Sequence, residues 1–311
     1  MANNSKTKKI IYILLGVMFL CFFLSGIIFL FSSNKNVIIN NSDNSTGVQF
    51  RTEKNLSIDN INNIDIDAAL GSIKITSEDR KDVKLIFSYN ENFFKNSVPT
   101  LNVNSYGTEA KIEIKYKSSL KKLNFGNSRI SLEVYIPKSY NKSLSLDTKL
   151  GDINLNNLDL DNLECSLSMG KSLINNINCN YFEYDNSMGD LNGDKIYTKE
   201  SEIELSMGSA NIKNFRGNLK AENSMGEIDI EYDEFNNNVD LEASMGSIRL
   251  TLPKKSEFSL SAKTSMGSVS CDFPLNTSIH KGSEIDGNIN NSNNRIIANS
   301  SMGSIDIRSK D

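Results

Sequence analysis

Few residues of this 311-residue chain have types and spacings that could support catalysis or bind a cofactor. The single histidine, His280, lies in the polar stretch 277–281, where we expect an exposed loop residue. A Ser-His-Asp or Cys-His arrangement needs a histidine as proton acceptor, so neither is predicted. The sequence also has no His-Glu-x-x-His, paired Cys-x-x-Cys or Gly-Lys-Ser/Thr phosphate loop. We therefore predict no catalytic, cofactor-binding or metal-binding residue, and a protein that is not an enzyme.

Two acidic patterns come closest to a functional site. Residues 190–194 have the spacing of a calcium loop, but Lys195 replaces the required glycine and Ser201 the bidentate glutamate, so no calcium site is expected. Carboxylates at alternate strand positions could form a pair that cleaves polysaccharide, although solvated strands also carry such charges. A cell-wall polysaccharide-active enzyme is therefore the alternative function. The carboxylates concerned are Glu183, Glu202, Glu204, Glu222, Asp229, Glu231 and Glu242.

The dominant feature of the chain is a repeated Ser-Met-Gly motif, with Leu-Gly in two earlier copies. All methionines except Met1 and Met18 belong to it. From Gly151 onward the glycines are 19, 19, 19, 18, 20, 21 and 36 residues apart, and self-similarity at this period indicates a stacked repeat. We predict that the repeated glycines form structural corners: Gly71, Gly151, Gly170, Gly189, Gly208, Gly226, Gly246, Gly267 and Gly303.

Side-chain parity explains why a corner is expected. Before Gly246 the apolar residues Leu241, Ala243 and Met245 share one parity, whereas Ile248 and Leu250 have the other. Alternate residues of a strand face opposite sides, so the strand must turn between the two sets. Glycine suits such a turn because it adopts positive φ without a Cβ clash. Methionine before the corner is predicted to fill interior space, since its side chain is flexible.

These features predict an all-β fold, namely a parallel β-solenoid (β-helix-like) with about 19 residues per turn over residues 141–311. Each turn would contain two short strands and a polar return segment. Residues 57–140 depart from the repeat and are expected to form an N-terminal β cap. A sandwich of antiparallel hairpins is the alternative fold, but the return segments lack a consistent Asn-Gly or Asp-Gly turn.

The gap between Gly267 and Gly303 is expected to be a loop or irregular turn before the last coil. Residues 304–308 would then leave an unpaired strand edge, through which homo-oligomers could form at the solenoid end. Asparagine is abundant, and in stacked strands we expect it to form turns and side-chain amide ladders.

An uncharged apolar segment, residues 10–31, predicts one transmembrane helix. As a helix it would span ~33 Å, against ~30 Å of hydrocarbon. The basic residues Lys6, Lys8 and Lys9 place the tail 1–9 in the cytoplasm, and 32–56 would be a polar linker. A cleaved signal peptide is the alternative, but no Ala-x-Ala-like site follows. The expected location is thus the plasma membrane, single-pass, with the β domain extracytoplasmic.

Charge and cysteine content narrow the possible partners. All acidic residues lie beyond residue 31, so the exterior part is net acidic, which argues against nucleic acid or bulk anionic lipid. The exterior cysteines Cys165, Cys179 and Cys271 are odd in number, and we expect small core residues instead of a disulfide framework.

Several motifs together resemble a known family. A strand ends in Val134-Tyr135-Ile136-Pro137-Lys138, the segment 144–153 follows, and serial Gly-x-Ile-x-Ile corners continue to residue 307. Over roughly residues 57–308 this resembles the bacterial putative-adhesin family of β-strand-repeat proteins, a domain of unknown function. The resemblance implies a β-solenoid-like exterior domain, often membrane-anchored and in some relatives tied to envelope stress, without catalytic residues.

The expected function is accordingly that of a membrane-anchored, non-enzymatic surface protein. It would act as an adhesin, an envelope scaffold or a stress-related protein. Its extended face would meet an envelope polymer or a surface protein.

Overall fold

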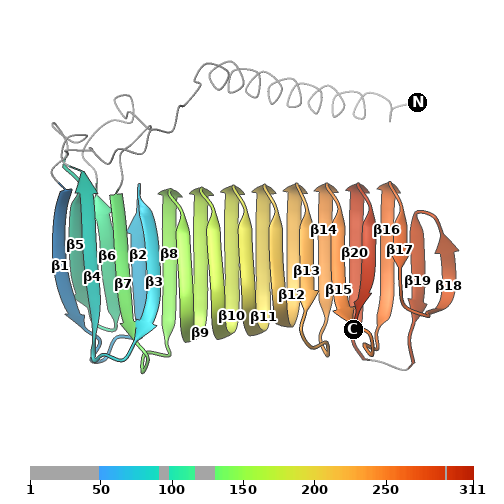
Figure 1. Cartoon of the computed structure of the whole chain (residues 1–311), viewed down its shortest axis with the longest axis horizontal. Helices are drawn as coiled ribbons and strands as arrows, with labels where there is room; N and C mark the ends of the chain where they lie inside the picture. Colours follow the sequence, from blue (N-terminus) through green and yellow to red (C-terminus); the bar gives the residue numbers. More distant parts are fainter. Residues whose placement is uncertain (1–48, 91–97, 116–129, 291–292) are drawn as a thin grey trace, which may run out of the picture. The chain divides into compact units, whose positions relative to one another are not determined.

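The computed structural model describes residues 49–90, 98–115, 130–290 and 293–311. Within those ranges no helix is long and apolar enough to cross a membrane. The predicted tail 1–9, the predicted helix 10–31 and linker residues 32–48 lie outside the described residues. The described residues form an elongated stack of strands (Figure 1).

The strands follow one another without a helix in the described part of the chain, which confirms the all-β class. Their bounds are β1 (Gln49–Ser57), β2 (Asn63–Ala68), β3 (Ser72–Glu78), β4 (Asp82–Asn90), β5 (Thr100–Tyr106), β6 (Glu109–Lys115), β7 (Ile130–Pro137), β8 (Ser143–Leu150), β9 (Ile153–Met169), β10 (Ser172–Met188), β11 (Leu191–Met207), β12 (Ala210–Met225), β13 (Ile228–Tyr232), β14 (Val239–Met245), β15 (Ile248–Pro253), β16 (Ser259–Met266), β17 (Val269–Cys271), β18 (Asn276–Lys281), β19 (Glu284–Asn288), β20 (Arg295–Met302) and β21 (Ile305–Lys310).

Parallel pairing between successive turns builds the central stack. We call one turn a coil and name it by its corner glycine. β9, β10 and β11 pair in parallel with a shift of 19 residues, so that Ile177 faces Leu158 on one side and Ile196 on the other. This agrees with a parallel β-solenoid and is inconsistent with a sandwich of antiparallel hairpins in these coils.

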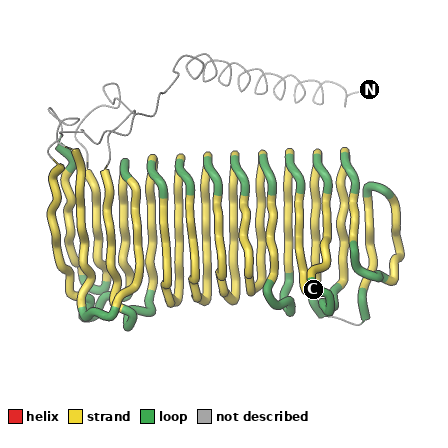
Figure 2. The backbone as a smooth tube through the Cα atoms, viewed as in Figure 1, coloured by secondary structure: helices red, strands yellow, loops and turns green. Residues whose placement is uncertain are grey.

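A second bend closes the central coils on the edge opposite the glycine corners. Here Asn157, Asn176 and Asn214 adopt positive φ of 56°, 54° and 51°. Asparagine tolerates this conformation better than most residues. The predicted polar return segment is therefore wrong for these coils, because one strand of 16 or 17 residues runs from each corner to the next. Figure 2 shows loops at one edge of the central coils and continuous strand at the other.

The predicted asparagine ladder lies at this second bend. Asn176 Nδ2 donates to Asn157 Oδ1 at 2.7 Å, and Asn178 Nδ2 donates to Asp159 Oδ1 at 2.9 Å. From the Gly208 coil onward a row of aromatic rings fills the interior beside this edge. Neighbouring rings in this row meet edge to face with centroids 5.1–6.1 Å apart: Phe215, Tyr232, Phe235, Phe258 and Phe273.

The N-terminal end combines one coil with antiparallel strands. β2 and β3 flank Gly71 and pair in parallel with β8 and β9, so the first motif copy belongs to the stack. β6 and β7 continue the two faces, and β5 and β4 pair antiparallel to them. Residues 49–56, assigned to the linker by their polarity, instead form β1, because β4 offers a free edge for antiparallel pairing.

The C-terminal end departs from sequence order. The Gly303 coil, β20 and β21, lies between the Gly246 and Gly267 coils and pairs with both. The expectation that residues 304–308 leave a free edge is therefore wrong, because both neighbours of β21 are present. Part of the expected loop between Gly267 and Gly303 also forms a hairpin, in which β19 pairs antiparallel with β16 and with β18.

The space between the two faces is filled by aliphatic and aromatic side chains. Cys165 and Cys179 are buried there as free thiols, and Cys271 is half-buried. Burial raises the pKa of Cys179 to about 12, so this thiol is protonated at neutral pH. The cysteines thus serve as small core residues, as their strand positions predicted.

Candidate interaction surface along the glycine corners

The corner glycines form one continuous column. All nine have positive φ between 128° and 158°. A Cβ on Gly170 would lie 1.9 Å from the carbonyl oxygen of Gly151, and one on Gly189 would lie 1.9 Å from that of Gly170. The Gly170 N–H donates to Met188 O at 3.0 Å. Glycine is therefore required twice over, by its backbone conformation and by the close approach of the next coil.

Buried polar side chains support the column from inside. Asn186 Nδ2 donates to Gly170 O at 3.0 Å, and Asn223 Nδ2 donates to Gly208 O at 2.8 Å. Thr264 Oγ1 donates to Gly303 O at 2.8 Å in the same way. Each of these residues stands three positions before its own glycine. Corner carbonyls that would otherwise lack a partner in the interior are thereby satisfied.

The methionine before each corner glycine points outward, so its predicted interior role is wrong. The exposed fractions are 45% for Met169, 40% for Met188 and 63% for Met266. A buried residue two positions earlier, which is polar or small in most coils and Leu167 or Leu205 in the other two, already occupies the space under the corner, and the chain turns immediately after the methionine. Seven methionines therefore form a ridge along the corner edge, in the order Met169, Met188, Met207, Met225, Met245, Met302 and Met266.

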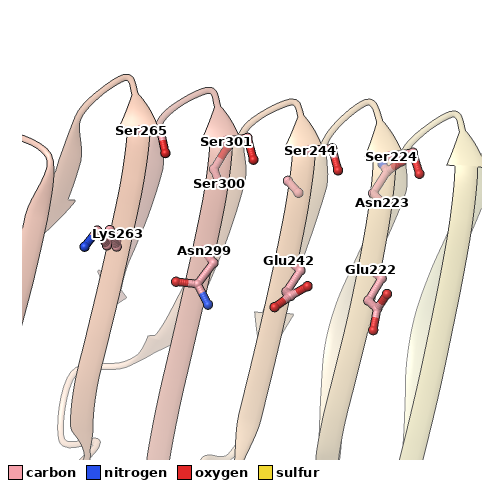
Figure 3. Close-up of a pocket in the computed structure, with 11 residues that line it drawn as sticks. Glu222, Asn223, Ser224, Glu242, Ser244, Lys263, Ser265, Asn299, Ser300 and Ser301 are labelled. Carbon is pink, nitrogen blue, oxygen red and sulfur yellow. The ribbon is translucent and has the colours of Figure 1, made fainter. Parts of the chain in front are cut away.

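A serine row runs beside this methionine ridge. The serine directly before each methionine is exposed and points away from the core: Ser168, Ser187, Ser206, Ser224, Ser244, Ser301 and Ser265. Over the last four of these coils the row forms one wall of a shallow groove of about 320 Å³. Figure 3 shows the groove, with Glu222, Glu242, Asn299 and Lys263 in the next outward row.

The same sheet face is acidic in its middle part. We define the acidic face by six residues at successive outward positions: Glu183, Asp185, Glu202, Glu204, Glu222 and Glu242. Lys220 Nζ lies 2.6 Å from Glu202 Oε1 and 3.0 Å from Glu222 Oε1. Burial, and then the neighbouring carboxylates, raise the pKa values of Asp185 and Glu204. The face thus holds closely spaced negative charge with one lysine among these carboxylates.

The structure divides the carboxylates that the sequence singled out between two faces. Glu183, Glu202, Glu204, Glu222 and Glu242 share the acidic face. Asp229 and Glu231 lie on the opposite face, where each is ion-paired: Arg249 Nη1 to Asp229 Oδ2 at 2.7 Å and Lys310 Nζ to Glu231 Oε1 at 2.6 Å.

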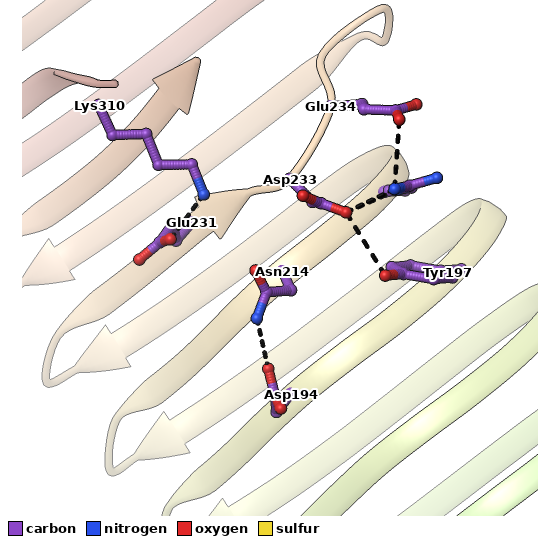
Figure 4. A network of polar contacts seen from close by, with 8 residues as sticks. Asp194, Tyr197, Asn214, Glu231, Asp233, Glu234 and Lys310 are labelled. Carbon is purple, nitrogen blue, oxygen red and sulfur yellow. Dashed lines mark hydrogen bonds and ion pairs between the residues drawn. The ribbon is translucent and has the colours of Figure 1, made fainter.

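The opposite face is charge-balanced and carries a second groove, of about 480 Å³, lined in part by Asn175, Asn192 and Asn211. Near it, Arg216 Nη2 contacts Asp233 Oδ2 at 2.5 Å and Glu234 Oε1 at 3.2 Å (Figure 4). The Arg216 guanidinium holds the pKa of Asp233 below its usual range. The charged side chains of the opposite face thus form ion pairs with one another, whereas those of the acidic face are mostly of one sign.

The remaining sequence candidates have structural roles. Asp194 of the calcium-like segment accepts a hydrogen bond from Asn214 Nδ2 at 2.7 Å, and Asp190 accepts one from Ser209 N at 3.1 Å. His280 is exposed, but it lies in strand β18 and not in a loop, because β19 pairs with it. Among the described residues no group of three His, Cys, Asp or Glu side chains could hold a metal ion.

Comparisons with known proteins point to one family. The family model described as Toastrack DUF4097 matches residues 61–308. The chain is similar in structure to a "putative adhesin" from Bacteroides fragilis, with a TM-score of 0.51, 14% identity, and coverage of 83% of this chain and 97% of that one.

Two further solved structures match with lower TM-scores. A "putative cell adhesion protein" from Clostridium sporogenes has a TM-score of 0.31 and 18% identity, covering 85% of this chain and 100% of that one. A "putative lipid binding protein" from Parabacteroides distasonis has a TM-score of 0.35 and 15% identity, covering 86% and 98%. A comparison with curated proteins found no match.

Proposed function

The chain belongs to the Toastrack DUF4097 family, and from this premise we propose that it is a non-enzymatic surface protein whose corner edge binds a repetitive polymer of the bacterial envelope. The name of the Bacteroides fragilis neighbour, a "putative adhesin", is consistent with such a role. Anchoring through the apolar segment 10–31 would hold the β domain outside the plasma membrane, with the N-terminus in the cytoplasm.

One observation carries the proposal, namely the alignment of like side chains along the stack. Ser224, Ser244 and Ser301 occupy the same position in successive coils, and their backbones lie side by side. Neighbouring strands are ~4.8 Å apart, so the hydroxyl groups repeat at that interval. A polymer with regularly spaced hydroxyl or amide groups can bind to such a row through many weak contacts, which together give high avidity.

Binding of the full chain to isolated bacterial cell walls tests this proposal. We expect the triple variant Ser224→Asp, Ser244→Asp and Ser301→Asp to lower retention on the walls by at least about tenfold, since several linked contacts are lost together. The matched control changes Asn175, Asn192 and Asn211 to aspartate, which adds the same charge to the opposite face. Equal retention of both variants and the unchanged chain would contradict binding at the corner edge.

A wall polysaccharide-active enzyme is the second candidate. The observation in its favour is that burial, followed by the neighbouring Asp185 and Glu222, raises the pKa of Glu204 on the acidic face, and a raised carboxyl pKa suits a general acid. Incubation of the chain with wall glycans should then release new reducing ends, and Glu204→Gln should abolish them. Absence of reducing ends with the unchanged chain would exclude this candidate.

A further inference from the structure

The methionine ridge carries a row of thioether sulfur atoms. Binding of a polymer at this edge does not require sulfur. Seven methionines occupy the same position, although leucine occupies it in the first two coils as Leu70 and Leu150. The position therefore accepts a hydrocarbon side chain. Of the seven ridge methionines, five have at least 40% of their surface exposed: Met169, Met188, Met245, Met266 and Met302.

The ridge is too narrow for an ordinary apolar interface. It is one side chain wide, with exposed serines on one side and polar residues such as Lys171, Asp190 and Ser209 directly after the glycines on the other. A hydrophobic docking site is a broad contiguous patch, whereas this apolar surface is a strip bordered by polar residues on both sides. The chemical feature that the row does repeat is the sulfur atom.

Backbone pairing fixes the spacing of these sulfur-bearing side chains. Met188 pairs with Met207, Met207 with Met225, and Met225 with Met245. The row continues through Met302 to Met266, because the inserted coil pairs with both neighbours. Adjacent strands are ~4.8 Å apart. Zinc–sulfur bonds are about 2.3 Å long, so an ion midway between two sulfurs that keep the strand spacing is within bonding distance of both.

Thioether sulfur is a soft, uncharged ligand that selects Cu(I) among biological metals. The acidic face beside the ridge adds negative charge, which raises the local concentration of cations. The methionine backbones are held by the coil pairing, whereas their side chains are flexible enough to turn a sulfur toward an ion. We propose that the methionine ridge is a binding site for soft monovalent cations, Cu(I) or Ag(I), each held between the methionines of two adjacent coils.

Methionine methyl NMR of the full chain in detergent tests the proposal, after its accessible thiols have been alkylated. Ag(I) is the probe because it needs no reductant. We expect equimolar Ag(I) to shift the ridge methyl signals and to leave those of Met1 and Met18 in place. Unmoved ridge signals, or equal movement of all the methionine signals, would overturn the proposal.

Two triple variants with equal numbers of methionines test the pairing itself. The alternate variant, Met188→Leu, Met225→Leu and Met302→Leu, leaves four methionines with no adjacent pair. The contiguous variant, Met169→Leu, Met188→Leu and Met207→Leu, leaves four in unbroken succession. Two linked ligands bind with a high effective concentration, so the contiguous variant should bind Ag(I) at least about tenfold more tightly. Equal affinity would overturn the paired site, and the Leu70 and Leu150 coils indicate that both variants fold.

Discussion

The central and C-terminal coils use the same motif but stack in different ways. In the centre, the Gly170, Gly189 and Gly208 coils follow one another in space as they do in sequence. At the C-terminal end the Gly303 coil is inserted between the Gly246 and Gly267 coils. The order of stacking is therefore not set by chain order. The fit of one corner onto the next, which all coils share, makes several orders of stacking possible.

The edge opposite the glycine corners shows what permits the Gly303 coil to insert between two others. Central coils are joined by tight bends at Asn157, Asn176, Lys195 and Asn214 with no intervening loop, so no coil can leave its place in the sequence order. From the Gly226 coil onward longer segments, such as 233–238, replace the bends, and the aromatic row fills the edge. The longer connections allow the chain to form the β18–β19 hairpin first and then return. Antiparallel strands thereby cover both ends of the parallel stack, which limits edge-to-edge association.

Removing the inserted coil should have the largest effect. Deletion of residues 293–311 removes the fully buried Ile296, Ile305 and Ile307 and separates the Gly246 and Gly267 coils. Burial of each such side chain contributes about 1.5–3 kcal/mol, so the loss should be on the order of 5 kcal/mol. The measurement is the free energy of unfolding in denaturant. A synthetic peptide of residues 293–311 serves as control and should restore stability, whereas an unchanged midpoint would mean that the Gly267 coil stacks directly on the Gly246 coil.

Adding a Cβ atom at a central corner glycine should lower the free energy of unfolding almost as much as deleting the inserted coil. Gly189→Ala places it 1.9 Å from Gly170 O, so we expect a loss of more than about 3 kcal/mol. Gly267→Ala places it 2.1 Å from Gly303 O, but no further corner stacks on this coil, and only the antiparallel strand β19 pairs beyond β16. The coil can therefore shift, and its loss should be smaller. Gly282→Ala, with no atom within 4 Å, is the control. Equal losses at Gly189 and Gly282 in chemical denaturation would contradict the corner column.

Loss of a buried polar support should have an intermediate effect. Asn186 Nδ2 donates to Gly170 O at 3.0 Å and to Tyr184 Oη at 3.1 Å, and its Oδ1 accepts from Met188 N at 3.0 Å. Asn186→Ala leaves these groups unpaired, so we expect a loss of about 1–3 kcal/mol. The C-terminal counterpart Ser300→Ala removes one bond, of 3.1 Å to Gly246 O, and should cost about 1 kcal/mol. A larger loss at Ser300 in thermal unfolding would reverse this ranking.

Removing one charge from the acidic face should have the smallest effect. This face lies on the central coils, and in the last two coils Asn299 and Lys263 occupy the equivalent outward position. The pKa of Glu204 is raised in the folded state, so folding favours its protonated form. Stability should therefore fall as pH rises through the titration of Glu204. Glu204→Gln should raise the Tm slightly at pH 7 and lose this advantage at acidic pH. Glu109→Gln, an exposed carboxylate on β6, is the control and should change neither value.

The sequence alone determined the repeating unit of this protein. The glycine spacing and the change of parity around Gly246 are local properties of the chain, because a strand can switch its buried side only by turning. Corner positions and the all-β class could therefore be predicted. The abundance of asparagine separately predicted an amide ladder, but not that it would include Asn157 and Asn176. The outward direction of Met245 could not be predicted. Alternation along a strand does not determine which way a side chain points when its residue lies at the turn itself.

Only the tertiary structure decided the order of the coils and the surfaces that result. The Gly246, Gly267 and Gly303 corners carry the same Ser-Met-Gly residues, so any of them could stack on any other as far as local sequence is concerned. Which two become neighbours depends on long connections and on contacts between segments far apart in the chain. The unbroken methionine ridge, the groove across Ser244 and Ser301 and the covered ends all follow from that choice.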